Sequence, residues 1–212
     1  MRFAEVRRAE TGAPAQVKLY TFPMTDPAPQ AMSVAEYQRR ERDGERKHEY
    51  VGGFVYPLHA QAGSTGTHSR ICLNIAVALY PHAEARGCRL YQEGMQLHIP
   101  RSNSFFYPDV MLVCGVDAPS EYYETLPCLL VEVMSPSTAH NDRRDKYRAY
   151  TDLPSLQTYL IVSQTERYVV AYERGEGGEW QMRELRAQGE VFVPCLGQSL
   201  TLEQIYGRLV TE

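Results

Sequence analysis

The chain has 212 residues, of which 43% are hydrophobic and 23% are charged, an ordinary composition for a globular protein. This length suits one well-buried domain, and a formal net charge of −4 argues against a protein that coats nucleic acid through bulk positive charge. The sequence has no apolar run of the roughly 18 residues that a membrane span needs, and no hydrophobic signal segment at its start. We therefore expect a cytoplasmic protein.

The five cysteines are odd in number and widely spaced: Cys72, Cys88, Cys114, Cys128 and Cys195. The sequence contains no C-x-x-C pair and no cysteine–histidine group with zinc-site spacing. We therefore predict that the cysteines are small buried hydrophobic residues, and that they form neither a disulfide framework nor a structural zinc site.

Residues 1–30 contain four prolines and no sustained hydrophobic period, which predicts an extended and partly disordered arm. A single domain is expected over residues 31–212. Its first element is a short helix, because Ser33 and Glu36 have the spacing of a capping box and Gly44 follows the polar run.

Two short strands joined at Gly52-Gly53 are the next expected element, in the segment "RKHEYVGGFVYPL". The segment "HSRICLNIAVALYPHA" then has a helical period that ends at Pro81. Its apolar stripe comprises Ile71, Cys72, Ile75, Ala78 and Leu79. His68 lies one turn before this stripe, on its inward side.

From Arg89 onward the pattern favours strands, beginning with the alternating segment "RLYQEGMQLHI". The denser segments "FFYPDVMLVCG" and "CLLVEVMS" indicate central strands that are buried on both faces. A helix in "NDRRDKYRAYTDL", further strands and a closing helix after Thr201 complete the order of elements. The predicted fold is α/β or α+β with a mixed sheet.

Glu132 stands in the middle of the apolar strand "PCLLVEVM", where an unpaired carboxylate would cost several kcal/mol. It shares one face of that strand with Leu130 and Met134, and in the strand "YPDVMLV" Asp109 shares one face with Met111 and Val113. If the two strands are neighbours, both acids can point to one place and share a divalent cation such as Mg²⁺. The alternative for either acid alone is a helix cap or an ion pair with an arginine.

The helix that follows carries Asp142, Lys146 and Tyr150 at intervals of four residues, so that all three lie on one face. A lysine aimed at the two acids could position a water molecule and offset charge on a phosphate. The alternative is that Asp142 and Lys146 form an exposed pair on the helix surface.

The motifs "YPDV", "VEVMSPST" and D-x-x-x-K-x-x-x-Y resemble, in this order and spacing, those of the Uma-type restriction endonucleases of the PD-(D/E)XK superfamily. The resemblance extends from Ser33 to Val210. It includes the segments "HEYVGG", "HSRI", "LPSLQTYLIVSQ" and "LTLEQIYGRL".

This resemblance implies a restriction-endonuclease-like mixed sheet flanked by helices, with Asp109 and Glu132 binding Mg²⁺, for which Mn²⁺ could substitute. Met134 stands where the superfamily motif E-x-K has its lysine, so Lys146 becomes the candidate for a migrated lysine. Glu49 could supply a third carboxylate, or it could be a surface acid of the hairpin.

His68 could bind phosphate or transfer a proton, or it could be a histidine with a structural role at its helix start. Gln92 and Glu93 could also reach the site if their strand lies next to it in the sheet. We rank these two residues below the other candidates for the site.

The resulting prediction is a metal-dependent endonuclease that hydrolyses DNA phosphodiester bonds. Six arginines are candidates for contacts with the DNA backbone: Arg143, Arg144 and Arg148, joined by Arg39, Arg40 and Arg42. A homodimer is expected by analogy with nucleases that cut both strands. The alternative is a catalytically silent module of the same fold that binds DNA or a protein partner.

Overall fold

A computed structural model describes residues 30–58, 65–115, 118–134 and 142–209 of the chain. The arm expected over residues 1–30 lies outside the described residues except for Gln30, which begins the first strand, β1. The segment Ser135–Thr138, the end of the motif "VEVMSPST", also lies outside them.

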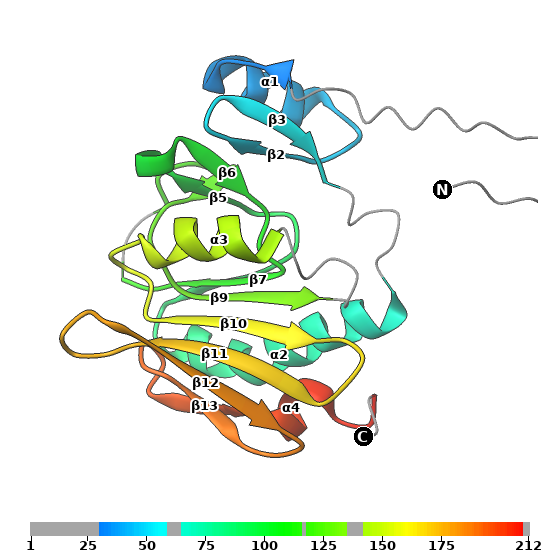
Figure 1. Ribbon diagram of the computed structural model, residues 1–212, viewed down its shortest axis with the longest axis vertical. Helices are drawn as coiled ribbons and strands as arrows, with labels where there is room; N and C mark the ends of the chain where they lie inside the picture. The colour runs from blue at the N-terminus through cyan, green and yellow to red at the C-terminus, as the bar shows by residue number, and fades with distance from the viewer. Residues whose placement is uncertain (1–29, 59–64, 116–117, 135–141, 210–212) are drawn as a thin grey trace, which may run out of the picture.

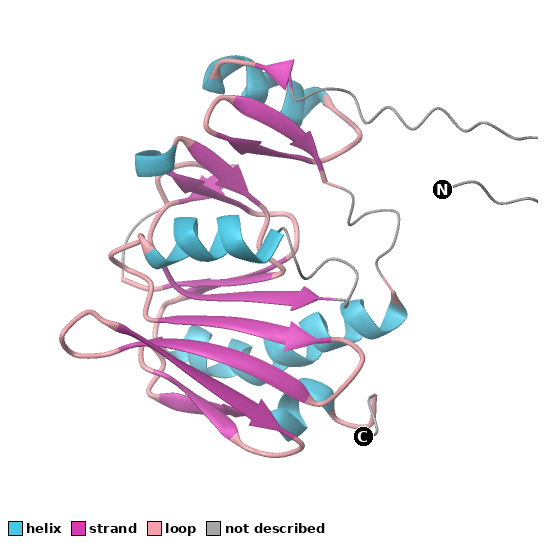
Figure 2. Cartoon of the chain, viewed as in Figure 1, coloured by secondary structure: helices cyan, strands magenta, loops and turns pink. Residues whose placement is uncertain are grey.

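Two six-stranded mixed sheets and a separate hairpin make up the β-structure of the described residues (Figures 1 and 2). The N-terminal sheet has the order β1 (Gln30–Ala31), β3 (Phe54–Pro57), β2 (His48–Val51), β6 (Ser104–Phe106), β5 (Gln96–Ile99) and β8 (Tyr123–Glu124). The central sheet has the order β12 (Trp180–Arg186), β11 (Tyr168–Arg174), β10 (Thr158–Ser163), β9 (Pro127–Met134), β7 (Val110–Val113) and β4 (Arg89–Gln92). The hairpin pairs β13 (Glu190–Val193) with β14 (Gln198–Thr201).

The longer helices cover both faces of the central sheet. In Figure 1, α2 (Gly66–Ala85) runs behind the sheet and α3 (Asp142–Thr151) lies in front of it. The short α4 (Leu202–Tyr206) joins α2 on the rear face, whereas α1 (Val34–Asp43) packs on the N-terminal sheet. The expected mixed sheet flanked by helices is therefore confirmed.

Strand β9 lies at the centre of the central sheet, and all eight of its residues are buried. It pairs antiparallel with β7, where Val110 faces Val131, and parallel with β10, where Ile161 faces Glu132. This confirms the prediction that the two densest apolar segments are neighbouring central strands.

Two predicted boundaries in the N-terminal half are also confirmed. Ser33 caps α1, since its hydroxyl oxygen accepts a hydrogen bond of 3.3 Å from the backbone N–H of Glu36. Strands β2 and β3 form the predicted hairpin, with Gly52 and Gly53 both at positive φ, where a residue without a Cβ atom is favoured.

The predicted end of α2 is wrong, because the helix continues past Pro81 to Ala85. Pro81 has no N–H group, so the carbonyl oxygen of Val77 loses its helical hydrogen bond. Both residues are exposed, so water can hydrogen-bond to that oxygen instead. Ala83 beyond the proline is fully buried and continues the apolar stripe. Packing of this last turn on the core therefore outweighs the break that the proline favours.

The segment "RLYQEGMQLHI" is divided between the two sheets, as β4 and β5. The chain turns at Glu93 and Gly94, whose φ angles are 51° and 91°. An alternating pattern is kept on both sides of this turn, so hydrophobic period alone could not reveal the change of sheet.

The expectation for the cysteines is wrong for four of the five. Disulfides join Cys88 to Cys114 and Cys128 to Cys195, and Cys72 is the buried free cysteine. These pairs are separated by 26 and 67 residues, so only the fold brings them together. Within the described residues, no helix is both long and apolar enough to cross a membrane.

Candidate functional site

Glu132 points from β9 toward α3, and two side chains of that helix contact its carboxyl group. The Tyr150 hydroxyl donates a hydrogen bond of 2.8 Å to Oε1, and Lys146 Nζ lies 3.4 Å from Oε2. Glu132 is 5% exposed, so these contacts replace the water that the carboxyl group loses on folding. A migrated lysine was the sequence-based candidate, and its ammonium group does reach Glu132.

Lys146 also connects the two sheets. Its Nζ atom lies 2.9 Å from Oε1 of Glu49, which belongs to β2 in the N-terminal sheet. Lys146 is only 4% exposed, so the alternative of an exposed surface pair with Asp142 is wrong. The Glu49 side chain is 12% exposed, so the alternative of a surface hairpin acid is wrong as well.

Asp109 lies directly before β7, at the same end of the β7–β9 pair as Glu132. Its Oδ2 atom accepts a hydrogen bond of 2.7 Å from the backbone N–H of Val133, the residue that follows Glu132. The same oxygen lies 3.2 Å from Nε2 of His68 on α2. Asp109 therefore contacts the main chain of β9 and a histidine, rather than an arginine.

His68 is held in place by its helix, since its backbone N–H donates to the hydroxyl oxygen of the N-cap residue Thr65. On its other side, Nδ1 lies 3.8 Å from Glu93 Oε1 and 3.8 Å from Cys72 Sγ. Glu93, which ranked low in the sequence analysis, is thus close to the site. Its neighbour Gln92 is the last residue of β4 and pairs with Val110 in the sheet.

The environment shifts the pKa of three of these groups. The pKa of Glu132 is raised to about 8, chiefly by burial and also by the charges of Asp109 and Glu49, whereas Lys146 and the Tyr150 hydrogen bond act in the opposite direction. Hydrogen bonding to Asp109 raises the pKa of His68, although burial opposes this. Burial also raises the pKa of Tyr150, so its hydroxyl keeps its proton and remains a donor.

The donor chemistry fits a hard divalent cation. The charges of Asp109 and Glu49 both act on the carboxyl group of Glu132, near one ammonium group and one imidazole. Among the described residues, however, the donor atoms of these three acids do not all lie within 4.8 Å of one another. A divalent cation would offset their excess negative charge, and carboxylate oxygens are the ligands that Mg²⁺ prefers. Donor atoms of His68, Cys72 and Asp109 do lie within 4.8 Å of one another, but burial raises the pKa of the Cys72 thiol, which disfavours it as a ligand.

The other residues that the sequence analysis named lie outside this cluster or outside the described residues. Met134 is buried in the apolar layer under α3, so no second lysine occupies the E-x-K position. Arg148 is exposed on α3, and Arg39, Arg40 and Arg42 are exposed on α1. The side chains of Asp142, Arg143 and Arg144 lie outside the described residues.

Comparison with known proteins gives a consistent picture. The family Uma2, described as "Putative restriction endonuclease", matches residues 34–203. Two uncharacterized proteins of Synechocystis sp., slr1290 and sll1609, are each 32% identical to this chain, over 176 and 162 residues. The first match covers 82% of this chain and 91% of its relative, and the second covers 74% and 89%.

A solved structure shares the fold. It is described as a "putative nuclease belonging to DUF820" from Anabaena variabilis, and it superimposes with a TM-score of 0.63 at 15% sequence identity. The match covers 78% of this chain and 93% of that chain. The family match over residues 34–203 and the two relatives at 32% identity identify the protein as a member of the Uma2 family, whose description is "Putative restriction endonuclease".

Proposed function

We propose that this chain is a Mg²⁺-dependent endonuclease that hydrolyses phosphodiester bonds of DNA, with Asp109 and Glu132 as the metal ligands. The observation that carries the proposal is the buried Glu132 in β9, whose carboxyl group is influenced by the charges of the part-buried Asp109 and Glu49. Burial raises the pKa of Glu132 to about 8 even with Lys146 beside it, so the ionised form is costly there and a divalent cation would stabilise it. Membership of a nuclease family supports the same reaction class.

Each neighbouring residue has a role that follows from its contacts. Bound Mg²⁺ would supply a water of lowered pKa and would polarise the phosphoryl oxygen. Lys146 lies between Glu49 and Glu132, where it can orient that water and offset charge on the phosphate. Tyr150 fixes the orientation of Glu132, and His68 fixes that of Asp109.

Binding of a DNA strand is assigned to local positive charge, because the chain as a whole is acidic. Arg148 is exposed on α3, the helix that supplies Lys146, so it can reach a phosphate beside the scissile bond. Arg143 and Arg144 precede Lys146 on the same helix and are proposed to extend this contact. Contacts of this kind position the backbone and give no base specificity.

The test compares Asp109→Asn with wild type in plasmid cleavage, with Mg²⁺, with Mn²⁺ and with EDTA. We expect a loss of at least about 100-fold in rate for the variant, since even residues that only support metal ligands contribute 10- to 100-fold. The control is Asp152→Asn, which removes an exposed carboxylate at the end of α3 and should cut at the wild-type rate.

Equal cleavage by Asp109→Asn and wild type would refute the assignment of Asp109. A wild-type chain that neither cuts DNA nor binds Mg²⁺ or Mn²⁺ in a titration would favour the silent module instead. One observation favours this second function: Met134 is buried at the position where the superfamily motif has its lysine.

A further inference from the structure

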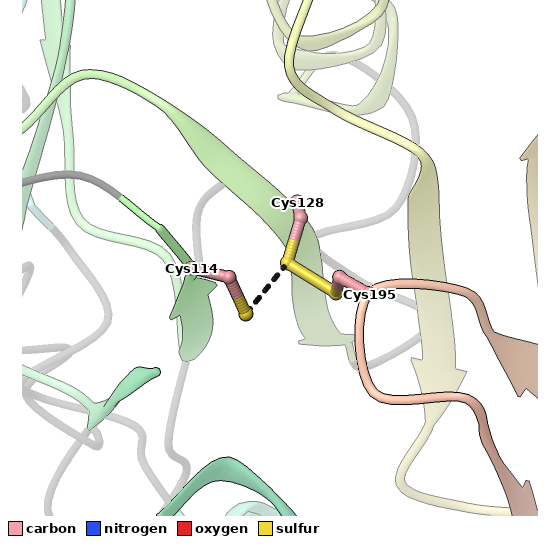
Figure 3. Close-up of side chains that lie close together, drawn as sticks. All are labelled: Cys114, Cys128 and Cys195. Carbon is pink, nitrogen blue, oxygen red and sulfur yellow. Dashed lines mark hydrogen bonds between the residues drawn. A yellow bond between two sulfur atoms is a disulfide. The ribbon is translucent and has the colours of Figure 1, made fainter. Parts of the chain in front are cut away.

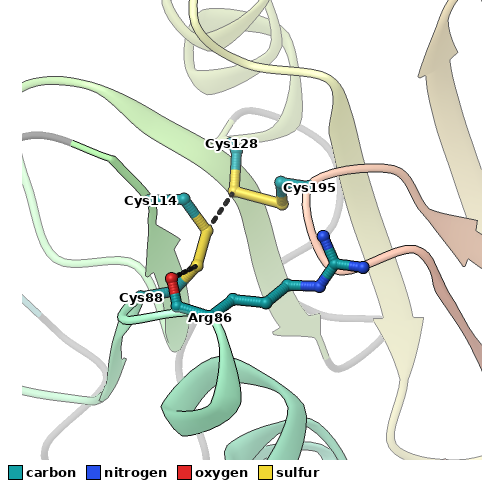
Figure 4. Close-up of a disulfide and its surroundings, with 5 residues drawn as sticks. All are labelled: Arg86, Cys88, Cys114, Cys128 and Cys195. Carbon is teal, nitrogen blue, oxygen red and sulfur yellow. Dashed lines mark hydrogen bonds between the residues drawn. A yellow bond between two sulfur atoms is a disulfide. The ribbon is translucent and has the colours of Figure 1, made fainter.

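Four of the five cysteines gather at one place, far from the carboxyl cluster. Figure 3 shows Cys114, Cys128 and Cys195 side by side, and their sulfur atoms all lie within 4.8 Å of one another. Figure 4 adds Cys88, which is bonded to Cys114. The two disulfides are in contact, since Cys114 Sγ and Cys128 Sγ are 3.8 Å apart. The three clustered sulfur atoms, together with that of Cys88 bonded to Cys114, make up what we call the cysteine centre.

The topology of the central sheet creates this cluster. Cys88 directly precedes β4 and Cys114 directly follows β7, and the two strands are antiparallel with Arg89 opposite Val113. Cys195 is delivered by the turn between β13 and β14. Four separate segments thus each contribute a single cysteine, which explains why the sequence has no C-x-x-C spacing.

Cys128 joins the cluster because of an irregularity in β9. Leu112 pairs with Leu129 but Val113 pairs with Pro127, so Cys128 has no partner opposite it and forms a bulge. Both Cys128 and the next residue, Leu129, consequently pack in the core on the α2 side, although side chains of a regular strand alternate. The bulge thus turns the Cys128 sulfur toward Cys114 and Cys195.

We propose that the cysteine centre, in its reduced form, binds one Zn²⁺ ion through the thiolates of Cys88, Cys114, Cys128 and Cys195. Thiolates are the ligands of structural zinc sites, and Zn–S bonds of about 2.3 Å in a tetrahedron place the sulfur atoms about 3.8 Å apart. The contact between Cys114 and Cys128 already has this length. The sulfur atoms of the two bonded pairs must move apart from their disulfide separation to reach this distance.

A dithiol reductant gives two electrons and two protons to each disulfide, which yields four thiols, and the reductant becomes a disulfide. Binding of Zn²⁺ then displaces the four thiol protons. Cys114 and Cys195 are only partly buried, so the centre can be reached by both the reductant and the metal ion.

A site with four thiolates and one Zn²⁺ ion has a negative net charge, so a neighbouring cation would stabilise it. The side chain of Arg86 runs past the cluster in Figure 4, and a Cβ atom placed on Gly197 would lie 2.8 Å from its Nη2 atom. The guanidinium group therefore lies against the turn that carries Cys195. At Gly197, where φ is +60°, the absence of a side chain leaves room for this approach.

The position of the centre indicates a structural role. Cys128 and Glu132 are four residues apart in β9, which is about 13 Å along a strand. The ligands connect β4, β7 and β9 to the β13–β14 turn, so the ion would fasten the hairpin to the sheet without contacting the carboxyl cluster.

The experiment is metal and thiol analysis of the full chain purified under a dithiol reductant. We expect one Zn²⁺ per chain that survives dialysis, and five thiols after the metal is chelated and the chain is denatured. Replacement by Co²⁺ should give the near-ultraviolet charge-transfer band of thiolate ligation, which cobalt bound to carboxylates alone does not give. Asp109→Asn should leave this band unchanged.

Matched variants locate the ion. Cys195→Ser, in an accessible turn, should weaken zinc retention at least about 10-fold, whereas Cys72→Ala should retain one Zn²⁺ per chain because Cys72 lies outside the centre. Should Cys195→Ser fail to fold, the band of the Co²⁺-substituted Cys72→Ala chain still decides the question. A fully reduced, folded chain that shows five thiols but neither retains Zn²⁺ nor gives the Co²⁺ band would overturn the proposal.

Discussion

The two faces of the central sheet are built from alternate residues of the same strands, yet they differ in chemistry. In β9, Leu129, Val131 and Val133 point toward α2 into an apolar layer made up mainly of aliphatic residues and cysteines. Leu130, Glu132 and Met134 alternate with them, and Glu132 faces Lys146 and Tyr150 of α3.

This difference separates two roles within one strand. Burial of apolar area on the α2 face stabilises the fold by about 25 cal/mol per Å², with little cost in buried polar groups. On the α3 face, the chain buries a carboxyl and an ammonium group, an arrangement that contributes little to stability compared with an apolar pair. A chemical role for the α3 face explains why the acid is tolerated there.

The largest expected effect comes from Lys146→Met, which keeps the length of the side chain but removes its charge. Cleavage should fall by about 10²- to 10³-fold, because the group proposed to offset charge on the phosphate is lost. Single-turnover rates on a plasmid would measure this. Arg148→Gln is the control on the exposed side of α3, and it should weaken DNA binding without the same loss in single-turnover rate at saturating enzyme.

Lys146→Met also tests which of the two functions is correct. If the chain is a silent module, wild type and variant will be equally inactive, and both will bind DNA alike. If wild type cuts and the variant cuts at the same rate, Lys146 is not the functional replacement for the E-x-K lysine.

The apolar part of the opposite face, which does not include His68 and Asp109, should respond in stability and not in chemistry. Leu129→Ala removes a fully buried side chain from the α2 face and should reduce the free energy of unfolding by about 2–5 kcal/mol. Urea denaturation measures this loss, and the cleavage rate of the remaining folded protein should match wild type. A variant of normal stability, or a folded variant that has lost cleavage, would contradict the separation of the two faces.

Much of the fold follows from local patterns in the sequence. The dense apolar runs identify β7 and β9 as central strands, the Ser33–Glu36 spacing locates the start of α1, and Gly52-Gly53 marks a hairpin. The exceptions are set by tertiary packing. Pro81 remains inside α2 because the turn beyond it buries Ala83, and the change of sheet at Glu93 and Gly94 leaves the alternating pattern intact.

The candidate site was predictable in part because its residues interrupt regular patterns. Glu132 breaks an apolar run, and the intervals between Asp142, Lys146 and Tyr150 place the last two on the face that contacts Glu132. The contact of Lys146 with Glu49 was not predictable, because it depends on how the N-terminal sheet packs beside α3. The clustering of four cysteines was missed for the same reason.

The smallest effect expected is a change in how stability depends on pH, tested with Glu132→Gln in the metal-free protein. The pKa of Glu132 is raised from 4.5 to about 8 in the folded chain, so between these values the folded state holds a proton that the unfolded state releases. The free energy of unfolding should therefore fall as pH rises through this window. Glu132→Gln removes this contribution, and because the charge of Glu132 is the smallest of the causes that act on the pKa of His68, most of the His68 contribution cancels in the difference.

Thermal unfolding in EDTA at several pH values from 5 to 9 would measure this difference. We expect the variant to gain stability relative to wild type as pH rises toward about 8, because the substituted amide stays neutral while the carboxyl group of Glu132 must ionise in a buried place. Mg²⁺ should then stabilise wild type more at the upper end of this range than at the lower end, since the metal competes with the proton for the same carboxyl group. Parallel pH profiles for the two chains would mean that Glu132 is already ionised without metal, and that Lys146 alone is sufficient to hold its charge.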